Sequence, residues 1–335
     1  MIYKLLRFIA INAIHVTFGA TGAILKMLRL DRIIADASQR NWVDRHAPEG
    51  WQPYMKLSRL DRPIGTWLLL LPCLWSIALA APKGEGPDFT LFILFAIGAL
   101  VMRGAGCTLN DIADRNFDGK VERTKKRPIP SGQVTLFQAI FWLGVQCLIG
   151  LLILIQFNVF AILLGIASLA LVAIYPFAKR FTCWPQFFLG LAFNYGALLG
   201  WAAVQGNLGV APVIMYFGGI AWTIGYDTIY AHQDKEDDAL IGVKSTALKF
   251  GETTRYWLMG FYTVTIISLL FAGAVVGLSV LFYLLMFGAA LHLVWQIRTL
   301  DIDNGNRCLM LFKSNRNFGL IVLIAIILGK LPLPL

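Results

Sequence analysis

Long apolar runs, separated by short polar breaks, fill the chain from about residue 63 to its end. Each run is close to the roughly 20 apolar residues that a helix needs to cross a bilayer. In lipid the backbone must satisfy its own hydrogen bonds, and a helix does so within one segment. The pattern therefore predicts an all-α, polytopic membrane protein with nine transmembrane helices, at 63–81, 90–110, 134–154, 157–176, 184–203, 210–231, 257–276, 279–297 and 317–333.

The loops between these segments alternate in charge. Those after the second, fourth, sixth and eighth predicted helices are rich in Lys and Arg. The opposite loops contain Lys83 and no Lys or Arg in the turns near 155, 206 and 277. Positively charged loops stay on the cytoplasmic or matrix side of a membrane. The alternation is a second signal for nine helices, since one helix more or fewer would disrupt it.

The first 53 residues predict an extension in front of a membrane domain at 54–335. An apolar run at 8–25 is flanked by basic residues, with no acid before Asp31. This fits an amphipathic anchor at the membrane surface, which we favour, a tenth span, or a mitochondrial presequence. The stretch 37–58 is typical of a surface linker. Because the opening lacks the Ser and Arg richness of a presequence, we expect a bacterial inner membrane, with the mitochondrial inner membrane as the alternative.

Composition agrees with the membrane class. Of 335 residues, 58% are hydrophobic and 14% charged, against about 45–50% and about 25% in soluble domains. The net charge of +10 lies mostly in loops that flank the membrane, so no nucleic-acid partner is expected. The five cysteines show no spacing typical of zinc sites or disulfide frameworks.

Acidic residues gather at the ends of two predicted helices. The first group closes the second helix, where Asn110, Asp114 and Asp118 share one helix face and Asp111 adds a further carboxylate. The second follows the sixth helix, where Asp227, Asp234 and Asp238 are spaced to share a face, with Asp237 between them.

Two such clusters on the same side of the membrane predict a cation site. Carboxylates four residues apart repel each other on a helix, so a bound cation would stabilise them. Oxygen ligands favour Mg²⁺, which binds through a few carboxylates together with phosphate oxygens. The alternative is that these acids are solvated and pair with neighbouring Lys and Arg. The candidate metal ligands are Asn110, Asp111, Asp114, Asp118, Asp234, Asp237 and Asp238.

Three basic residues belong to the same interpretation. Arg127 follows the first acidic group and Lys179 closes the fourth helix, so both could balance the charge of a metal-bound phosphate, or simply set topology. Arg103 lies inside a predicted span, where a cation needs an anionic partner. That partner is either a neighbouring Asp or the carboxylate of a substrate.

At these residues the sequence resembles the UbiA superfamily of intramembrane aromatic prenyltransferases. The resemblance covers roughly 54–335 and includes four stretches. They are Leu60-Asp-Arg-Pro-Ile-Gly-Thr, the run Asn110-Asp-x-x-Asp-x-x-x-Asp118 with its Arg-Pro-Ile-Pro-Ser-Gly sequel, Tyr175-Pro-Phe-Ala-Lys-Arg, and Tyr226-Asp-Thr-Ile-Tyr-Ala with the acidic run after it. The Tyr175 and Tyr226 stretches favour the branch of the family that acts in ubiquinone biosynthesis.

The resemblance implies helices around a central cavity that opens sideways to lipid. It implies a prenyltransferase that uses Mg²⁺, a polyprenyl diphosphate and 4-hydroxybenzoate, and it leaves open an association with other proteins of the ubiquinone pathway. Its residues would be Asp114, Asp118, Asp234 and Asp238 at the metal and diphosphate, Asp227 or released diphosphate as proton acceptor, Arg127, Lys179 and Tyr175 at the phosphates, Asn110 beside the metal, and Arg103 at the acceptor carboxylate.

Three other functions could account for parts of this pattern. The first is a member of the same family with another aromatic or porphyrin acceptor. The second is a membrane transporter, which fits poorly because the acids lie at one membrane face and not at the midplane. The third is a lipid-binding scaffold, which two intact acidic motifs disfavour.

Overall fold

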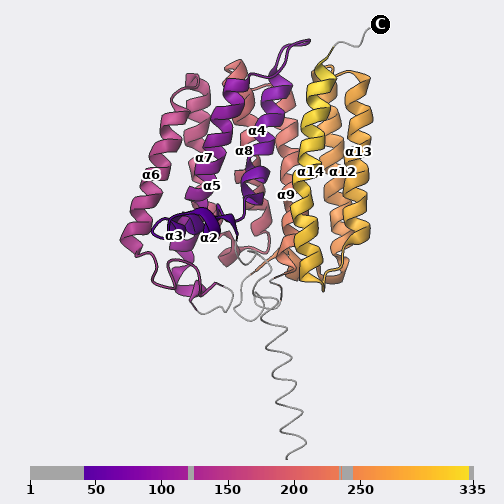
Figure 1. The fold of residues 1–335 in the computed structure, drawn as a ribbon. Helices are drawn as coiled ribbons and strands as arrows, with labels where there is room; N and C mark the ends of the chain where they lie inside the picture. Colours follow the sequence, from indigo (N-terminus) through magenta and orange to yellow (C-terminus); the bar gives the residue numbers. More distant parts are fainter. Residues whose placement is uncertain (1–40, 120–123, 234, 236–243, 332–335) are drawn as a thin grey trace, which may run out of the picture.

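The computed structural model describes residues 41–119, 124–233, 235 and 244–331. Within these ranges the chain is helical and contains no β-strand, so the all-α prediction is confirmed. Nine helices of 17 to 30 residues run side by side as one bundle (Figure 1). They are α4 (Ile64–Ala80), α5 (Phe89–Asp118), α6 (Leu136–Leu154), α7 (Val159–Phe181), α8 (Pro185–Gln205), α9 (Val210–Ala231), α12 (Thr254–Val275), α13 (Val280–Thr299) and α14 (Gly305–Lys330).

Seven of the helical segments in the described ranges are long and apolar enough to cross a membrane. The remaining two are α4, which has 17 residues, and α9, which has 22 residues but includes several Gly, Thr and Tyr. Most of α9 is buried among other helices, so its sequence does not need to be strongly apolar. Seven of the nine predicted spans are therefore helices long and apolar enough to cross a membrane, while α4 and α9 run through the bundle beside them (Figure 1).

Several helices extend beyond their apolar segments. α5 continues to Asp118 instead of ending at 110, and α14 begins at Gly305 instead of 317. Asn304 caps α14, because its side chain accepts a hydrogen bond from the Arg307 amide. Apolarity marks the part of a helix that meets lipid, whereas a polar turn can continue the helix past the lipid boundary.

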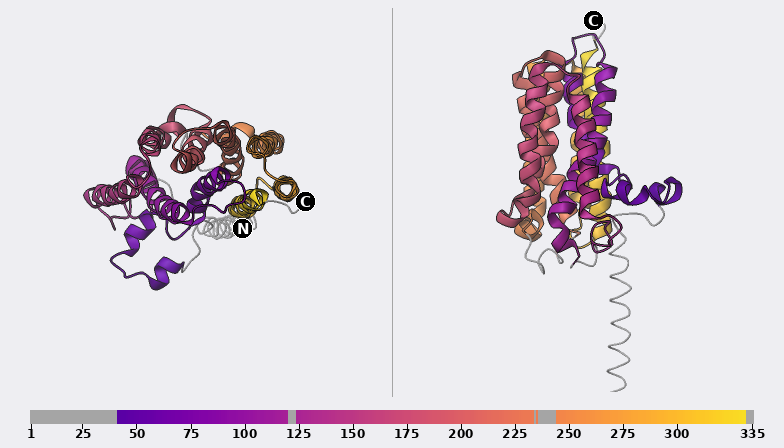
Figure 2. Two further views of the ribbon diagram at one scale, coloured as in Figure 1. Left: turned by 90° about the horizontal axis from the view of Figure 1, so that it is seen from above. Right: turned by 90° about the vertical axis from the view of Figure 1, so that its left-hand side faces the viewer.

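Two short helices lie across the bundle beside α5 and α6 (Figures 1 and 2). They are α2 (Trp42–His46) and α3 (Gln52–Leu57), so part of the expected linker at 37–58 is helical. Leu57 is fully buried and packs with Val134 and Ala139. The expected domain boundary after residue 53 falls inside α3.

Glycines allow α8 to approach α4 closely. A Cβ atom on Gly200 would lie 2.7 Å from the carbonyl oxygen of Cys73, and Gly196 faces the same residue. The hydroxyl of Ser76 on α4 donates a hydrogen bond to the carbonyl of Ala197. Small residues four positions apart are a common way for membrane helices to pack, because they let two backbones come together.

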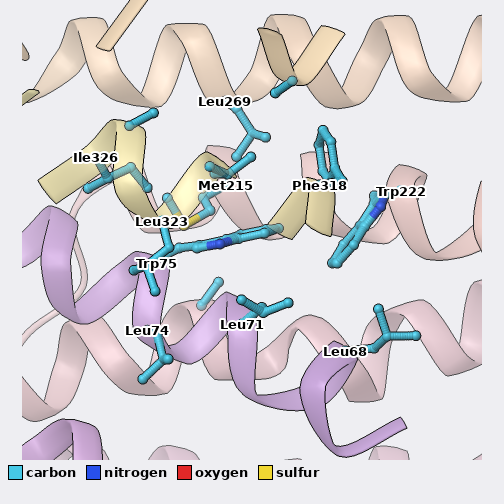
Figure 3. Packing of buried hydrophobic residues seen from close by; sticks show 14 of the residues in the cluster. Leu68, Leu71, Leu74, Trp75, Met215, Trp222, Leu269, Phe318, Leu323 and Ile326 are labelled. Atoms are coloured by element: carbon cyan, nitrogen blue, oxygen red, sulfur yellow. The ribbon is translucent and has the colours of Figure 1, made fainter. Parts of the chain in front are cut away.

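A continuous apolar core joins α4 to α9, α12 and α14 (Figure 3). The ring centroids of Trp75 and Trp222 are 5.2 Å apart, and Phe318 packs on both rings. Each indole has a hydrogen-bond partner, since Trp75 donates to the carbonyl of Gly319 at 2.7 Å and Trp222 to Asn315 Oδ1 at 2.8 Å. This core holds α4 as one wall of the cavity described next.

Candidate active site

A cavity of about 490 Å³ lies among α4, α5, α6, α7 and α8. One end is polar and is lined by Arg59, Arg62, Arg103, Asn110, Asp111, Arg127, Tyr175 and Tyr230. The remainder is an apolar arm between α5, α6 and α7, lined by residues that include Phe95, Gly98, Gly150, Leu154, Phe157 and Gly165. The helices around it come from the first part of the chain, and α9 contributes Tyr230.

Asp114 lies at the centre of the polar contacts formed by the end of α5. Its carboxylate is buried, and Oδ2 accepts hydrogen bonds from Lys179 Nζ and, at 3.3 Å, from Asn110 Nδ2. Oδ1 has no hydrogen-bond partner, and Arg180 Nη2 lies 3.5 Å from it. Oδ1 is thus contacted by one cationic side chain but accepts no hydrogen bond, so it can still accept a metal ion. The residues present therefore fit a divalent cation with oxygen ligands.

Asp118 is one turn further along α5 and is bound to Arg127. Arg127 Nη1 donates to Asp118 Oδ2 at 2.8 Å and also to Asp111 Oδ1 at 3.1 Å. Burial raises the pKa of the Asp118 carboxyl above its usual value, although the Arg127 guanidinium acts in the opposite direction. Additional positive charge near this carboxyl would favour its ionised form.

Asp111 has different surroundings from Asp114. It is fully buried, and Arg59 Nη2 donates to both of its carboxylate oxygens, at 2.7 and 3.1 Å. The sequence analysis missed Arg59. A signal was present, because Arg59 and Arg62 directly precede the first predicted span, on the same side of the membrane as the acidic motif.

Arg103 lines the polar end of the cavity within α5. Its Nη1 donates to the Cys107 sulfur, its guanidinium lies 5.5 Å from the centroid of the Phe193 ring, and its Nε is buried without a hydrogen-bond partner. Gly65 of α4 makes room for it, because a Cβ atom there would lie 2.8 Å from Arg103 Nη2. A guanidinium in this setting can bind an anionic group that enters the cavity.

The second acidic motif begins on α9, and Tyr175 of α7 lies between its first acid and the site. Tyr175 lines the cavity, and Asp227, Arg103 and Asp114 are near enough to its hydroxyl to interact electrostatically. α9 carries Asp227 and ends at Ala231. The amide of Lys244 donates to the carbonyl of Lys179 at 3.4 Å, so the chain that follows the second motif returns beside the first.

The rest of that motif, Asp234, Asp237 and Asp238, lies outside the described residues. Among the residues that are described, no group of three His, Cys, Asp or Glu side chains is arranged to hold a metal ion. The first motif therefore brings cations and carboxylates together but does not complete a metal site without further ligands.

The chain is a helical membrane bundle whose cavity joins a cation-lined polar end to an apolar arm. These features are typical of an enzyme class that acts on an anionic, lipid-like substrate within the bilayer. The chain belongs to the UbiA prenyltransferase family, whose model matches residues 69–321. It is accordingly a prenyltransferase, and the family expectation from sequence is confirmed.

Its curated relatives are similar over most of the chain. The mitochondrial 4-hydroxybenzoate polyprenyltransferase of Arabidopsis thaliana is 52% identical over 87% of this chain and 72% of the relative. The Rattus norvegicus enzyme of the same name is 52% identical over 85% and 76%. Both names specify mitochondria, so the comparisons do not support the expected bacterial inner membrane.

Solved structures share the fold at lower identity. A UbiA homologue from Archaeoglobus fulgidus bound to GPP and Mg²⁺ matches with a TM-score of 0.61 and 17% identity, over 83% of this chain and 98% of that one. A UbiA homologue from Aeropyrum pernix K1 matches with a TM-score of 0.62 and 24% identity, over 78% and 96%. At these identities the likeness concerns the fold alone.

Proposed function

We propose that this enzyme transfers a polyprenyl group from polyprenyl diphosphate to 4-hydroxybenzoate, at the ring carbon ortho to the hydroxyl. The product is 3-polyprenyl-4-hydroxybenzoate, an intermediate of ubiquinone biosynthesis. The observation that carries the proposal is one cavity that joins a cation-lined polar end to an apolar arm, in a chain 52% identical to enzymes of that name.

The polar end suits a diphosphate. Arg127 and Lys179 carry positive charge beside Asp114 and Asp118, and Arg gives two parallel hydrogen bonds to phosphate oxygens. The carboxylates of Asp114 and Asp118, with Asn110 and the acids of the second motif at Asp234, Asp237 and Asp238, would hold Mg²⁺. Bound Mg²⁺ would offset the negative charge of the diphosphate leaving group.

The apolar arm suits the prenyl chain. Phe95 and Phe157 stack with ring centroids 4.9 Å apart, and Gly98, Gly150 and Gly165 also line this arm. Burying apolar surface favours binding at roughly 25 cal/mol for each Å². The same walls exclude water, which would otherwise capture an allylic cation.

Arg103 is proposed to orient the acceptor by pairing with its carboxylate. This places the phenol ring beside Phe193 and the polar end of the cavity. Arg103 is set apart from the Asp114 and Asp118 ion pairs by its partners, Cys107 and Phe193.

The proposed reaction replaces an allylic C–O bond with a C–C bond to the aromatic ring. The allylic C–O bond breaks, and its electron pair leaves with the diphosphate, whose charge Arg127 and Lys179 help to neutralise. The ring carbon ortho to the hydroxyl forms the new C–C bond. That carbon then loses its proton to a base, for which Asp227 and released diphosphate are the two candidates.

We further propose a mitochondrial membrane, which the names of the relatives support, and a division into an extension at 1–53 and a catalytic domain at 54–335. An association with other proteins of ubiquinone biosynthesis stays part of the proposal, to be tested by co-purification from native membranes.

The test is a transfer assay in membranes that carry the expressed chain. Labelled 4-hydroxybenzoate and a long-chain prenyl diphosphate are supplied with Mg²⁺, with EDTA, and with EDTA followed by excess Mg²⁺. We expect a prenylated product that disappears with EDTA and returns with Mg²⁺. A folded protein that forms no such product would refute 4-hydroxybenzoate as the acceptor, and activity that survives EDTA would refute the metal.

A further inference from the structure

We propose that Arg59 is a diphosphate-binding residue, and that Asp111 is a positioning residue that holds Arg59 and Arg127 at the polar end of the cavity instead of binding the metal. The inference rests on the proposed function for its substrate, a prenyl diphosphate. It changes the role expected for Asp111 from sequence and assigns one to Arg59.

Asp111 lies on a different face of α5 from the proposed metal ligands. Asn110, Asp114 and Asp118 share a face of α5, and Asp111 lies 100° away from Asn110 around the helix. Its carboxylate is fully buried, and both oxygens accept hydrogen bonds from Arg59, at 2.7 and 3.1 Å. Oδ1 accepts a third from Arg127 at 3.1 Å. Both Asp111 oxygens are thus occupied by hydrogen bonds from guanidinium groups, which makes this carboxylate a poor ligand for a further cation. Asp114 is also paired with two cations, Lys179 and Arg180, but its Oδ1 accepts no hydrogen bond and Arg180 Nη2 lies 3.5 Å from it.

The backbone of Arg59 has an uncommon conformation. Its φ angle is 56°, and within the described residues it is the one non-glycine residue with positive φ. Such a conformation is uncommon and persists only where the surroundings hold it. Here the guanidinium is held by Asp111 and by the carbonyl of Lys56, to which Nη1 donates at 3.1 Å. The fold thus maintains an unfavourable backbone conformation while bringing this side chain to the cavity, which it lines.

The residues next to Arg59 and Arg127 are held in place by hydrogen bonds and packing. Ser58, next to Arg59, accepts hydrogen bonds from Trp142 at 2.8 Å and from Gln146 at 2.9 Å, both on α6. Leu57 packs with Val134 in a small core that also touches Ile129, in the segment that carries Arg127. Arg59 and Arg127 are therefore fixed to one unit built from α3, α5 and α6, with Asp111 between them.

Two arginines held by one carboxylate form a preorganised grip for a diphosphate. A planar guanidinium has five N–H groups, so it can donate to Asp111 and to a phosphate oxygen at the same time. In Arg59 the phosphate would compete with the Lys56 carbonyl for Nη1. Arg59 and Arg127 both line the polar end of the cavity, on the same side as Asn110. Without Asp111 the two like charges would repel, and the grip would lose its geometry.

The experiment measures binding without catalysis. The full chain in detergent is titrated with a non-reactive geranyl thiolodiphosphate at saturating Mg²⁺, and the Mg²⁺ concentration that half-saturates this binding is then determined. We expect Arg59→Gln and Asp111→Asn each to weaken the analogue by roughly tenfold or more, as expected for losing a charge-assisted contact. The Mg²⁺ half-saturation should stay within about twofold of the parent.

Four further variants serve as comparisons for Arg59→Gln and Asp111→Asn. Arg59→Lys should recover part of the affinity, and the double variant should be little weaker than either single one, because the two residues act as a unit. Asp114→Asn should raise the Mg²⁺ requirement. Arg255→Gln, which removes an exposed arginine that donates to the Leu300 carbonyl, should bind like the parent.

Two outcomes would overturn the proposal. If Asp111→Asn raises the Mg²⁺ half-saturation as Asp114→Asn does, Asp111 is a metal ligand. If the Arg59 variants lower the melting temperature but keep the parent's affinity, Arg59 is only a clamp for the loop before α4. Should Asp111→Asn fail to fold, the Arg59→Gln and Arg59→Lys pair decides alone. A parent that binds the analogue but does not prenylate 4-hydroxybenzoate would refute the acceptor and leave this inference standing.

Discussion

The two carboxylate oxygens of Asp114 have different surroundings. Oδ2 is bound by Lys179 and Asn110, while Oδ1 has no hydrogen bond although it is buried. Burying such an atom without a hydrogen bond has a cost, although Arg180 Nη2 lies 3.5 Å away and offsets part of its charge. The arrangement is typical of functional sites, where a local cost is retained because it prepares the site for binding.

We predict that Asp114→Asn abolishes transfer, with kcat reduced by at least about 100-fold, because the amide is neutral and a weak cation ligand. The assay is prenyl transfer in detergent, with folding checked by size-exclusion chromatography. The control is Asp44→Asn, which removes an exposed carboxylate paired with Lys56 on α2 and α3. Full activity of the Asp114 variant would rule out its role at the metal.

Arg103 is the corresponding cation for the acceptor. We predict that Arg103→Ala raises the KM for 4-hydroxybenzoate by roughly 10- to 100-fold and changes the KM for the prenyl diphosphate little, because one charged contact is lost. The methyl ester of the acceptor should lose much less than the free acid. If only the KM for prenyl diphosphate rises, Arg103 belongs to the phosphate site.

At the scale of the elements, the cavity depends on how α4 meets α8. The two helices approach through Gly196 and Gly200, and Cys73 on α4 both packs against these glycines and lines the cavity. α8 contributes Phe193 to the same cavity wall, opposite Arg103. A substitution that separates α4 from α8 should therefore change the shape of the cavity without replacing any residue that lines it.

Gly200→Val is the direct test of this packing. Its Cβ would lie 2.7 Å from a backbone oxygen, which cannot move aside as a side-chain end can. We predict a loss of about 1–3 kcal/mol in stability, as is usual for overpacking. Gly288→Ala on α13, where a Cβ meets nothing within 4 Å, is the control. Thermal unfolding in detergent measures both, and equal melting temperatures would contradict the prediction.

At the scale of the molecule, the outer surface and the loops set the orientation in lipid. Large apolar side chains are exposed along α6, with Phe137 79% and Phe141 67% accessible, as expected for a surface that faces lipid. The turn between α4 and α5 lies at the opposite end of the bundle from the segment that joins α5 and α6 (Figure 1). If α4 and α9 cross the membrane with the other seven, the loops must alternate sides.

Cysteine labelling tests this topology. In a chain whose five cysteines are replaced, single cysteines are placed at three exposed loop positions, Glu85, Ser131 and Asn207. In sealed vesicles, a membrane-impermeant maleimide should label Ser131→Cys from one side, and Glu85→Cys and Asn207→Cys from the other. Labelling of Glu85→Cys and Ser131→Cys from the same side would show that α5 does not cross the membrane as predicted.

Local pattern was enough to predict the helices, and it also predicts an orientation, which the labelling experiment tests. The limits of 210–231 agree with α9, and the other segments differ mainly where polar turns extend a helix. Helix formation, lipid contact and loop charge all depend on residues near one another in the chain, so the sequence carries them directly. The spacing of Asn110, Asp114 and Asp118 along α5 follows from helix periodicity alone.

Contacts between distant residues were decided by packing. Arg59 meets Asp111 across 52 positions and Lys179 meets Asp114 across 65, and no periodicity relates either pair. The place of the cavity among the helices α4 to α8 likewise depends on which of them pack closely, as α4 and α8 do through Gly196 and Gly200, and which stand apart. A sequence shows which charges are available at one membrane face, but only the assembled helices determine which arginine each carboxylate holds.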